Sequence, residues 1–209
     1  MAEILKIDEK KPLAGQLKDA FKFLKDGEVI AIPTDTLYGL AALLGDEKAV
    51  KEVYKIKKRD IKNPIPILID SLPSLDLYAR EILPYAKNFA KMFWPGPLTM
   101  IFKPTQLVSA IICGGRDGVG IRVPANKIVN FLTSKVGAMT GTSANLSEGT
   151  DPINAQIVDK QIGRKIKLII CSGPSLLKKG STVIDVREKF PKLIREGVIP
   201  WPKIISSMF

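Results

Sequence analysis

The sequence predicts a single α/β domain, residues 1–209, in which helices flank a twisted sheet of parallel and antiparallel strands. Helical and strand patterns alternate from end to end, which is typical of α/β proteins. Three successive strand patterns near the carboxyl end, at 167–171, 181–186 and 192–197, favour a mixed sheet over a purely parallel one. With 209 residues, 45% of them hydrophobic, the chain is long enough to bury a sizeable core, and no linker or repeat divides it.

The helices are predicted from apolar spacing and from end signals. Leu13, Leu17, Phe21 and Leu24 recur at helical spacing. The segment 46–59 is predicted to be a helix with Asp46 as its N-cap and basic residues gathered at its carboxyl end, where the helix dipole favours them. Further helical patterns cover 83–94, which ends at a Pro-Gly-Pro sequence, 126–135 and 153–163.

The strands are predicted from short apolar or alternating runs. The run 26–33 is typical of a buried strand, and 65–70 alternates in the manner of a half-buried one. The remaining strand patterns before the carboxyl-terminal group cover 98–103, 119–124 and 136–143.

Composition limits the chemistry that the chain can perform. Histidine is absent, which excludes histidine-dependent triads, HExxH zinc sites and histidine general bases. The 32 Lys and Arg against 21 Asp and Glu give a net charge of +11, which favours an anionic partner, although a lysine-coated surface would give the same count. Cys113 and Cys171 form no CxxC pair, so neither a disulfide framework nor a cysteine metal site is expected.

Apolar runs and the first residues of the chain predict its location in the cell. No apolar run approaches the roughly 20 residues of a membrane span, and the first residues lack the layout of a signal peptide. We therefore expect a cytoplasmic protein without a membrane partner.

Two glycine-rich segments do not match the nucleotide motifs that they resemble. The segment "CGGRDGVG" has the wrong spacing for a dinucleotide turn and precedes a strand. The segment "GPSLLKKGST" lacks the Gly-Lys-Ser/Thr order of a phosphate loop. A nucleotide site, if present, must be built differently.

Polar residues interrupt the apolar pattern at five strand or helix ends, where sites on α/β sheets are commonly built. Each is explained on its own by a capped turn, a solvated helix end or, for Arg122, an internal carboxylate partner. The alternative for each is that it contributes hydroxyls, amides or cations to a ligand site, and for Arg122 alone the two explanations have equal weight. The clusters are Thr34-Asp35-Thr36 with Tyr38; Lys57-Lys58-Arg59 with Asn63; Arg122; Ser143 with Asn145; and Ser181-Thr182 with Arg195.

Taken together, these clusters are similar to one family. The blocks "PTDTLYGLAA", "KIKKR…NP", "WPGPLT", "VGIRVP", "TSANLS", "STVIDV" and "IREG" occur in the order found in the YrdC/TsaC family of L-threonylcarbamoyladenylate synthases. The resemblance runs from about Gly27 to Pro200 and is to the short, single-domain form. It implies a YrdC-like fold with a basic concave cavity.

The resemblance also implies a reaction. L-Threonine, bicarbonate and ATP would give threonylcarbamoyl-AMP and pyrophosphate, for the N6-threonylcarbamoyl modification of tRNA adenosine 37. ATP is then a substrate, Mg²⁺ is expected on its phosphates, and no metal site made by the protein is implied. A cationic pocket suits these substrates because it offsets the repulsion between their anionic groups. The implied partners are downstream threonylcarbamoyl-transferase proteins and tRNA or double-stranded RNA.

Residue roles follow by the same resemblance. Thr36, Arg122 and Thr182 are expected to bind threonine, and Lys57 and Arg59 to act in catalysis. Thr34, Tyr38 and Ser181 are expected in the pocket wall. The expected ATP-binding residues are Lys57, Arg59, Asn63, Ser143, Asn145 and Arg195.

Two positions depart from the family pattern. Asp60 replaces a proline found in many relatives, and Leu68 lies at or near a histidine that some relatives have beside threonine. The loop 58–63 is a candidate for a mobile lid.

Two other functions are compatible with parts of the sequence. A non-catalytic YrdC-fold protein acting in RNA binding or ribosome maturation would account for the net charge, and steeply salt-dependent RNA binding would distinguish it. A paralogue with another acceptor, as in hydrogenase maturation, would fit the fold. The set Thr36, Arg59, Arg122 and Ser143 favours a small-molecule pocket and thus the enzyme.

Overall fold

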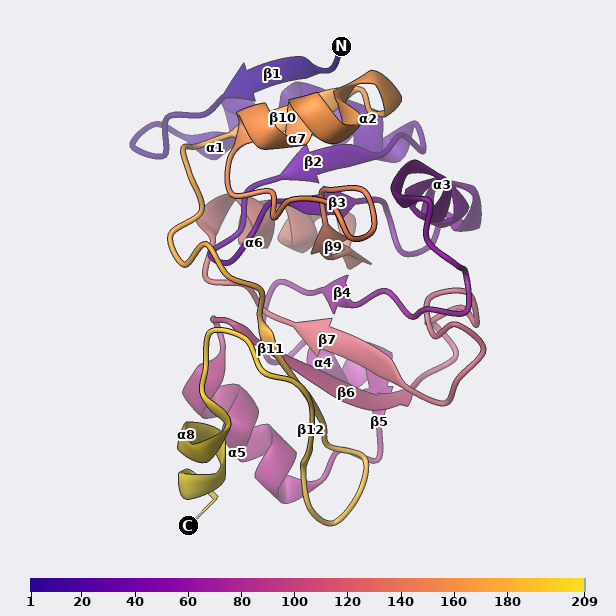
Figure 1. The fold of residues 1–209 in the computed structure, drawn as a ribbon, viewed down its shortest axis with the longest axis vertical. Coiled ribbons are helices and arrows are strands. Elements are labelled where there is room, and N and C mark those ends of the chain that lie inside the picture. Colours follow the sequence, from indigo (N-terminus) through magenta and orange to yellow (C-terminus); the bar gives the residue numbers. More distant parts are fainter. Residues whose placement is uncertain (209) are drawn as a thin grey trace.

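The computed structural model describes residues 1–208, and its strands form two mixed sheets at opposite ends of an elongated molecule (Figure 1). The first sheet has the order β1 (Glu3–Lys6), β10 (Leu168–Cys171), β2 (Ile30–Ile32), β3 (Gly39–Ala41) and β9 (Thr142–Ser143). The second has the order β12 (Lys192–Arg195), β11 (Thr182–Asp185), β6 (Leu98–Pro104), β7 (Val119–Arg122), β4 (Ile67–Leu68) and β8 (Met139–Thr140), and β5 (Ala79–Arg80) pairs with β6. The predicted α/β class with parallel and antiparallel pairs is confirmed, but the strands form two sheets where we expected one.

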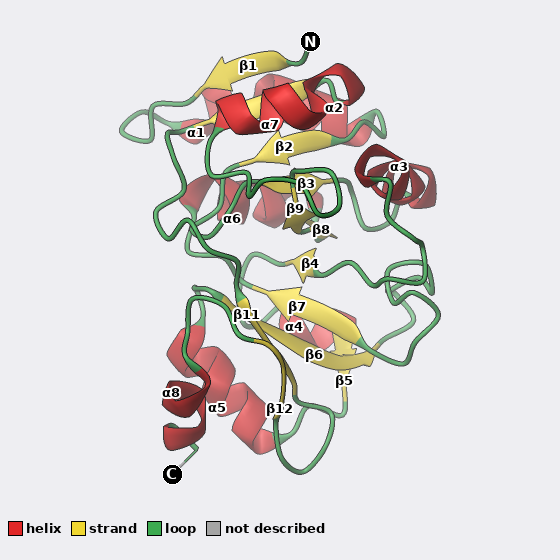
Figure 2. Cartoon of the chain, in the orientation of Figure 1, coloured by secondary structure: helices red, strands yellow, loops and turns green. Residues whose placement is uncertain are grey.

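Helices cover both sheets (Figure 2). In Figure 1, α7 lies in front of the first sheet, with α2 and α6 behind it, while α5 and α8 lie beside the second sheet. The helices are α1 (Leu13–Gln16), α2 (Lys18–Lys25), α3 (Glu47–Lys57), α4 (Leu75–Tyr78), α5 (Pro84–Phe93), α6 (Lys127–Val136), α7 (Ala155–Ile162) and α8 (Trp201–Ser206), with a 3-10 turn at Gly163–Lys165. No helix among residues 1–208 is long and apolar enough to cross a membrane.

Local signals explain where several elements begin and end. Asp46 is the N-cap of α3, as predicted, because its Oδ1 accepts hydrogen bonds from the backbone N–H groups of Lys48 and Ala49. The apolar spacing of 13–24 predicted one helix, but the helix is interrupted at Leu17, which separates α1 from α2. The exposed strand β1 was not predicted, because only one of its four residues is even half-buried and no apolar alternation marks it.

A bend at Gly141 carries the chain from one sheet to the other. Met139 and Thr140 pair with β4 of the second sheet, whereas Thr142 and Ser143 pair with β3 of the first. A Cβ atom at Gly141 would lie 2.5 Å from Leu68 Cγ, so a larger residue would push these strands apart. This bend explains why one predicted strand, 136–143, serves two sheets.

Strand alternation gives the second sheet one polar face and one apolar face. In β11 and the residue before it, Ser181, Val183 and Asp185 face the space between the sheets. Ile184 points the other way and joins the main hydrophobic core. The polar face becomes the floor of a cavity.

Candidate functional site

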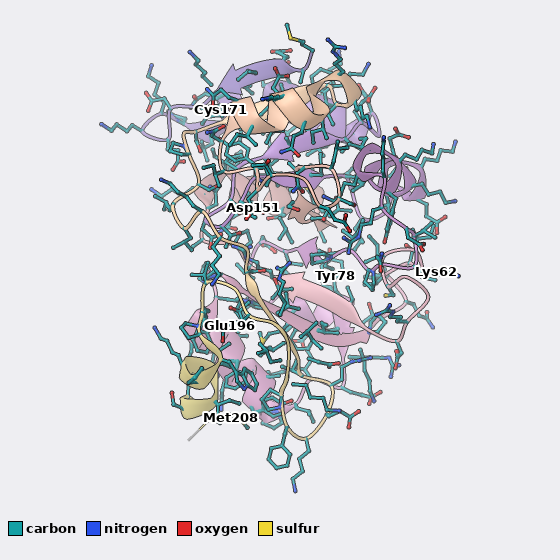
Figure 3. All side chains as sticks on the ribbon, viewed as in Figure 1. Lys62, Tyr78, Asp151, Cys171, Glu196 and Met208 are labelled. Atoms are coloured by element: carbon teal, nitrogen blue, oxygen red, sulfur yellow. The ribbon has the colours of Figure 1, made fainter. Side chains whose placement is uncertain are left out.

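A cavity of about 640 Å³ lies between the two sheets. The first sheet and its loops contribute Thr36 and Ser143 to its wall, and the second contributes Thr99 and Ser181. Figure 3 labels Asp151 in the half of the molecule that holds the first sheet, and Glu196 in the other half. The charged residues of the wall are Arg59, Arg116, Arg122, Arg187, Arg195, Asp151, Asp185 and Glu196.

Arg122, at the end of β7, is held by three contacts. Its Nε donates to the carbonyl oxygen of Gly96 at 2.9 Å and its NH1 donates to Thr36 Oγ1 at 2.7 Å. Its NH2 forms an ion pair with Asp35 Oδ1. Burial lowers the pKa of Arg122, and the neighbouring Asp35 opposes that shift. Asp35 is therefore the internal carboxylate partner of the buried Arg122.

The turn 34–38 presents Thr36 to the cavity. Thr34 Oγ1 donates to the carbonyl oxygen of Leu37 at 2.6 Å and accepts from the Thr36 N–H at 3.1 Å. Tyr38 is fully buried, and its OH donates to the carbonyl oxygen of Gly173 at 2.6 Å. Burial raises the pKa of Tyr38. The turn therefore forms part of the cavity wall, which Thr34, Thr36 and Tyr38 all line.

Arg59 lines the cavity, and the backbone of the next loop orients its side chain. Its Nε donates to the carbonyl oxygen of Asn63 at 3.2 Å and its NH2 donates to that of Pro64 at 3.0 Å. Asn63 lines a smaller adjoining cavity of about 370 Å³, which Arg59 also borders. The mobility of 58–63 stays a prediction.

Lys57 lies outside the main cavity, with its ammonium group buried beneath the loop that follows β9. Its Nζ donates to the carbonyl oxygens of Ser143 at 2.6 Å and Asn145 at 2.8 Å, and to Asn145 Oδ1 at 3.0 Å. Burial, with a smaller contribution from Arg59, lowers the pKa of Lys57 to about 8. The three N–H groups of the ammonium therefore have protein partners, which fits a residue that holds the loop in place.

Ser143 and Asn145 have different positions. Ser143 lines both cavities, and its Oγ donates to Asn145 Oδ1 at 2.7 Å. Asn145 lines only the smaller cavity, and its Nδ2 donates to the carbonyl oxygens of Gly149 at 3.0 Å and Thr150 at 3.3 Å. Asn145 thus ties the loop 143–150 together.

Ser181 and Arg195 line the main cavity, whereas Thr182 does not. Arg195 NH2 donates to the Ser181 carbonyl oxygen at 2.9 Å, and burial lowers the pKa of Arg195. Thr182 is fully buried on the opposite face of β11. Its Oγ1 donates to the carbonyl oxygen of Ile199 at 2.7 Å and accepts from the N–H groups of Gly197 and Ile199 at 3.0 Å. The expected threonine contact of Thr182 thus lacks geometric support, because a strand directs neighbouring side chains to opposite faces.

Several wall residues were not predicted from the sequence. Arg187 forms an ion pair with Asp185, and both line the cavity. Arg116 belongs to "CGGRDGVG", which was considered only as a dinucleotide turn. The one sequence feature that could have indicated Arg116 is an isolated arginine beside flexible glycines. Leu68 pairs with Arg122 in the β4–β7 register and lines the cavity beside it, so an apolar group stands next to the buried arginine.

Comparisons with known proteins find relatives over most of the chain. The family model Sua5_yciO_yrdC, described as "Telomere recombination", matches residues 22–197. A protein of Pyrococcus abyssi named threonylcarbamoyl-AMP synthase is 37% identical over 190 residues, which cover 90% of this chain and 56% of that protein.

Two solved structures share the fold. The crystal structure of P. abyssi Sua5 complexed with L-threonine matches with a TM-score of 0.92 at 35% identity, over 99% of this chain and 60% of that one. The crystal structure of E. coli YciO matches with a TM-score of 0.86 at 27% identity, over 96% of this chain and 98% of that one. The chain therefore spans little more than half the length of the P. abyssi protein and nearly all of YciO.

Proposed function

The chain belongs to the Sua5/YciO/YrdC family, and from this premise we propose that it is an L-threonylcarbamoyladenylate synthase. This nucleotidyltransferase would convert L-threonine, bicarbonate and ATP into threonylcarbamoyl-AMP, pyrophosphate and water. The product would serve the threonylcarbamoylation of tRNA adenosine 37, so tRNA and a threonylcarbamoyl-transferase protein are the proposed downstream partners.

The observation that carries the proposal is the grouping of Thr36, Asp35 and Arg122 at a cavity with four further arginines in its wall. A buried arginine with fixed orientation suits a carboxylate, because its planar fork matches that group. The hydroxyl of Thr36 is a neutral polar group beside it. Threonine would bind here with its carboxylate toward Arg122. The solved complex of the P. abyssi relative with L-threonine supports threonine as a ligand of this family.

The chemistry needs two attacks in a confined space. The threonine amine would add to the carbon of bicarbonate, and loss of water from this adduct would give the carbamate. A carbamate oxygen would then attack the α-phosphorus of ATP, releasing pyrophosphate. Both steps depend mainly on positioning and on cations placed where charge develops. Arg59, Arg195 and Ser143 line the cavity where the nucleotide would lie. Lys57 and Asn145 would support them by fixing the loop that carries Ser143.

Mg²⁺ would enter with ATP. Among residues 1–208, no group of three or more Cys, Asp or Glu side chains is arranged to hold a metal ion. A magnesium ion held by substrate phosphates and water needs no such group.

The proposed reaction is tested by following an isotope label from bicarbonate into the product. The purified protein is incubated with ATP, L-threonine and ¹³C-bicarbonate, and the nucleotide products are measured by mass spectrometry. The proposal predicts ¹³C in threonylcarbamoyl-AMP. Formation of ADP or AMP without a labelled carbamoyl product would contradict it.

A further inference from the structure

Arg116 differs from the other arginines of the cavity wall. Arg59 and Arg195 donate to backbone carbonyl oxygens, while Arg122 and Arg187 form ion pairs with Asp35 and Asp185, and the side chain of Arg116 has no hydrogen-bond or ion-pair partner among residues 1–208. Its charge is therefore available to a ligand.

The loop that carries Arg116 is docked against the loop that carries Arg59. Tyr54 OH lies 2.9 Å from the carbonyl oxygen of Ile111 and 3.2 Å from that of Asn63, which fastens the two loops together. Gly114 has a φ of +58°, and a Cβ atom there would lie 2.5 Å from the carbonyl oxygen of Lys62. Gly114 thus allows the two loops to approach closely, and Arg116, two residues later, lines the cavity.

Arg116 precedes β7, whose last residue is Arg122, and both arginines line the cavity. Gly118, Gly120 and Arg122 alternate along the strand and all line the cavity. Four residues of extended strand span about 13 Å, so the segment from 118 to 122 covers a distance that an amino acid alone would not fill. The part of the cavity next to Arg116 would therefore receive ATP.

The acidic groups near Arg116 have other partners. Asp117 Oδ1 lies 3.6 Å from Arg80 NH2, and Asp185 pairs with Arg187. Arg59 and Arg116 thus add two positive charges to the cavity wall. This suits a chain of phosphate groups better than a nucleoside.

We propose that Arg116 binds the polyphosphate of the nucleotide, the part that leaves as pyrophosphate, together with Arg59. This inference rests on the proposed function in naming ATP as the ligand. The contact is a charge-assisted hydrogen bond at a partly solvated site, so its loss should weaken binding by about ten-fold.

The experiment compares Arg116→Gln and Arg116→Lys with the wild-type protein, with Arg164→Gln as the matched control. Arg164 is an exposed arginine in the 3-10 turn Gly163–Lys165 and lines neither cavity. Dissociation constants for pyrophosphate, for a non-hydrolysable ATP analogue, for AMP and for L-threonine are measured by calorimetry.

We expect Arg116→Gln to weaken pyrophosphate and the ATP analogue about ten-fold, with AMP and threonine unchanged and with partial recovery in Arg116→Lys. Equal pyrophosphate affinity in Arg116→Gln and Arg164→Gln would overturn the inference. An equal loss of AMP affinity would do the same, since the contact would then lie on the nucleoside monophosphate. Because these are binding measurements, they are independent of whether the wild-type protein makes threonylcarbamoyl-AMP.

Discussion

Arg122 and Asp35 form an ion pair whose two side chains are only 7% and 3% exposed, at the point where Arg122 also donates to Thr36. Buried charges are costly to leave unpaired, so the pair fixes the guanidinium group before any ligand arrives. The remaining N–H groups of Arg122 can then serve a carboxylate without a rearrangement.

Replacing Asp35 by asparagine should destabilise the fold. The variant leaves the charge of Arg122 buried without a counter-charge, and we expect a loss of about 3 kcal/mol in the free energy of unfolding. Urea denaturation measures it. The control is Glu28→Gln, which removes an exposed pair with Lys167 at 3.8 Å and should cost less than about 1 kcal/mol. Equal losses in the two variants would show that the Arg122–Asp35 pair is not a structural feature of the site.

Substitutions at Thr36 and Thr182 should have different effects, on threonine binding and on folding stability respectively. Thr36→Val removes the hydroxyl that faces the cavity and should raise the KM for threonine about ten-fold, because a hydrogen bond to a charged group is lost. Thr182→Val removes a hydroxyl with three backbone partners and should lower the free energy of unfolding by about 1–3 kcal/mol, with the KM for threonine unchanged. Steady-state kinetics and urea denaturation measure the two effects. A KM change in Thr182→Val as large as that in Thr36→Val would restore Thr182 as a threonine ligand.

For Thr182, the sequence predicted the strand but not the face of the strand on which the side chain lies. Its position in "STVIDV" marked the right strand, and the alternation of Ser181, Val183 and Asp185 toward the cavity follows from a period of two. The sequence did not say which face was the polar one, because both faces carry a hydroxyl at the start of the strand. The burial of Thr182 and Ile184 on the other face decides it.

Lys57 should make stability depend on pH. Its pKa is lowered to about 8 in the folded protein, so between pH 8 and the ordinary pKa of a lysine the unfolded chain binds more protons. Stability therefore rises with pH across this window. Lys57→Met should remove that rise, so the difference in unfolding free energy between wild type and variant should grow in favour of the wild type from pH 8 to pH 10. A difference that stays constant with pH would show that the ammonium group is not destabilised by burial.

The rest of the site could not be read from the sequence because its contacts join distant segments. The sequence identified Asp35 and Arg122 separately, and an internal carboxylate was one of the two partners considered for the arginine. That Asp35 is this carboxylate follows from the fold, which brings the turn after β2 to the end of β7. Tyr54 carried no signal, since its role is to join two loops that are 48 residues apart along the chain, at 63 and 111.

The proposed synthase binds threonine, bicarbonate and ATP in one cavity and makes them react there. The most direct test is the rate of pyrophosphate release by the purified wild-type protein, with each of threonine and bicarbonate omitted in turn. We expect pyrophosphate release only when ATP, threonine and bicarbonate are present together. Release at the same rate without threonine would contradict it.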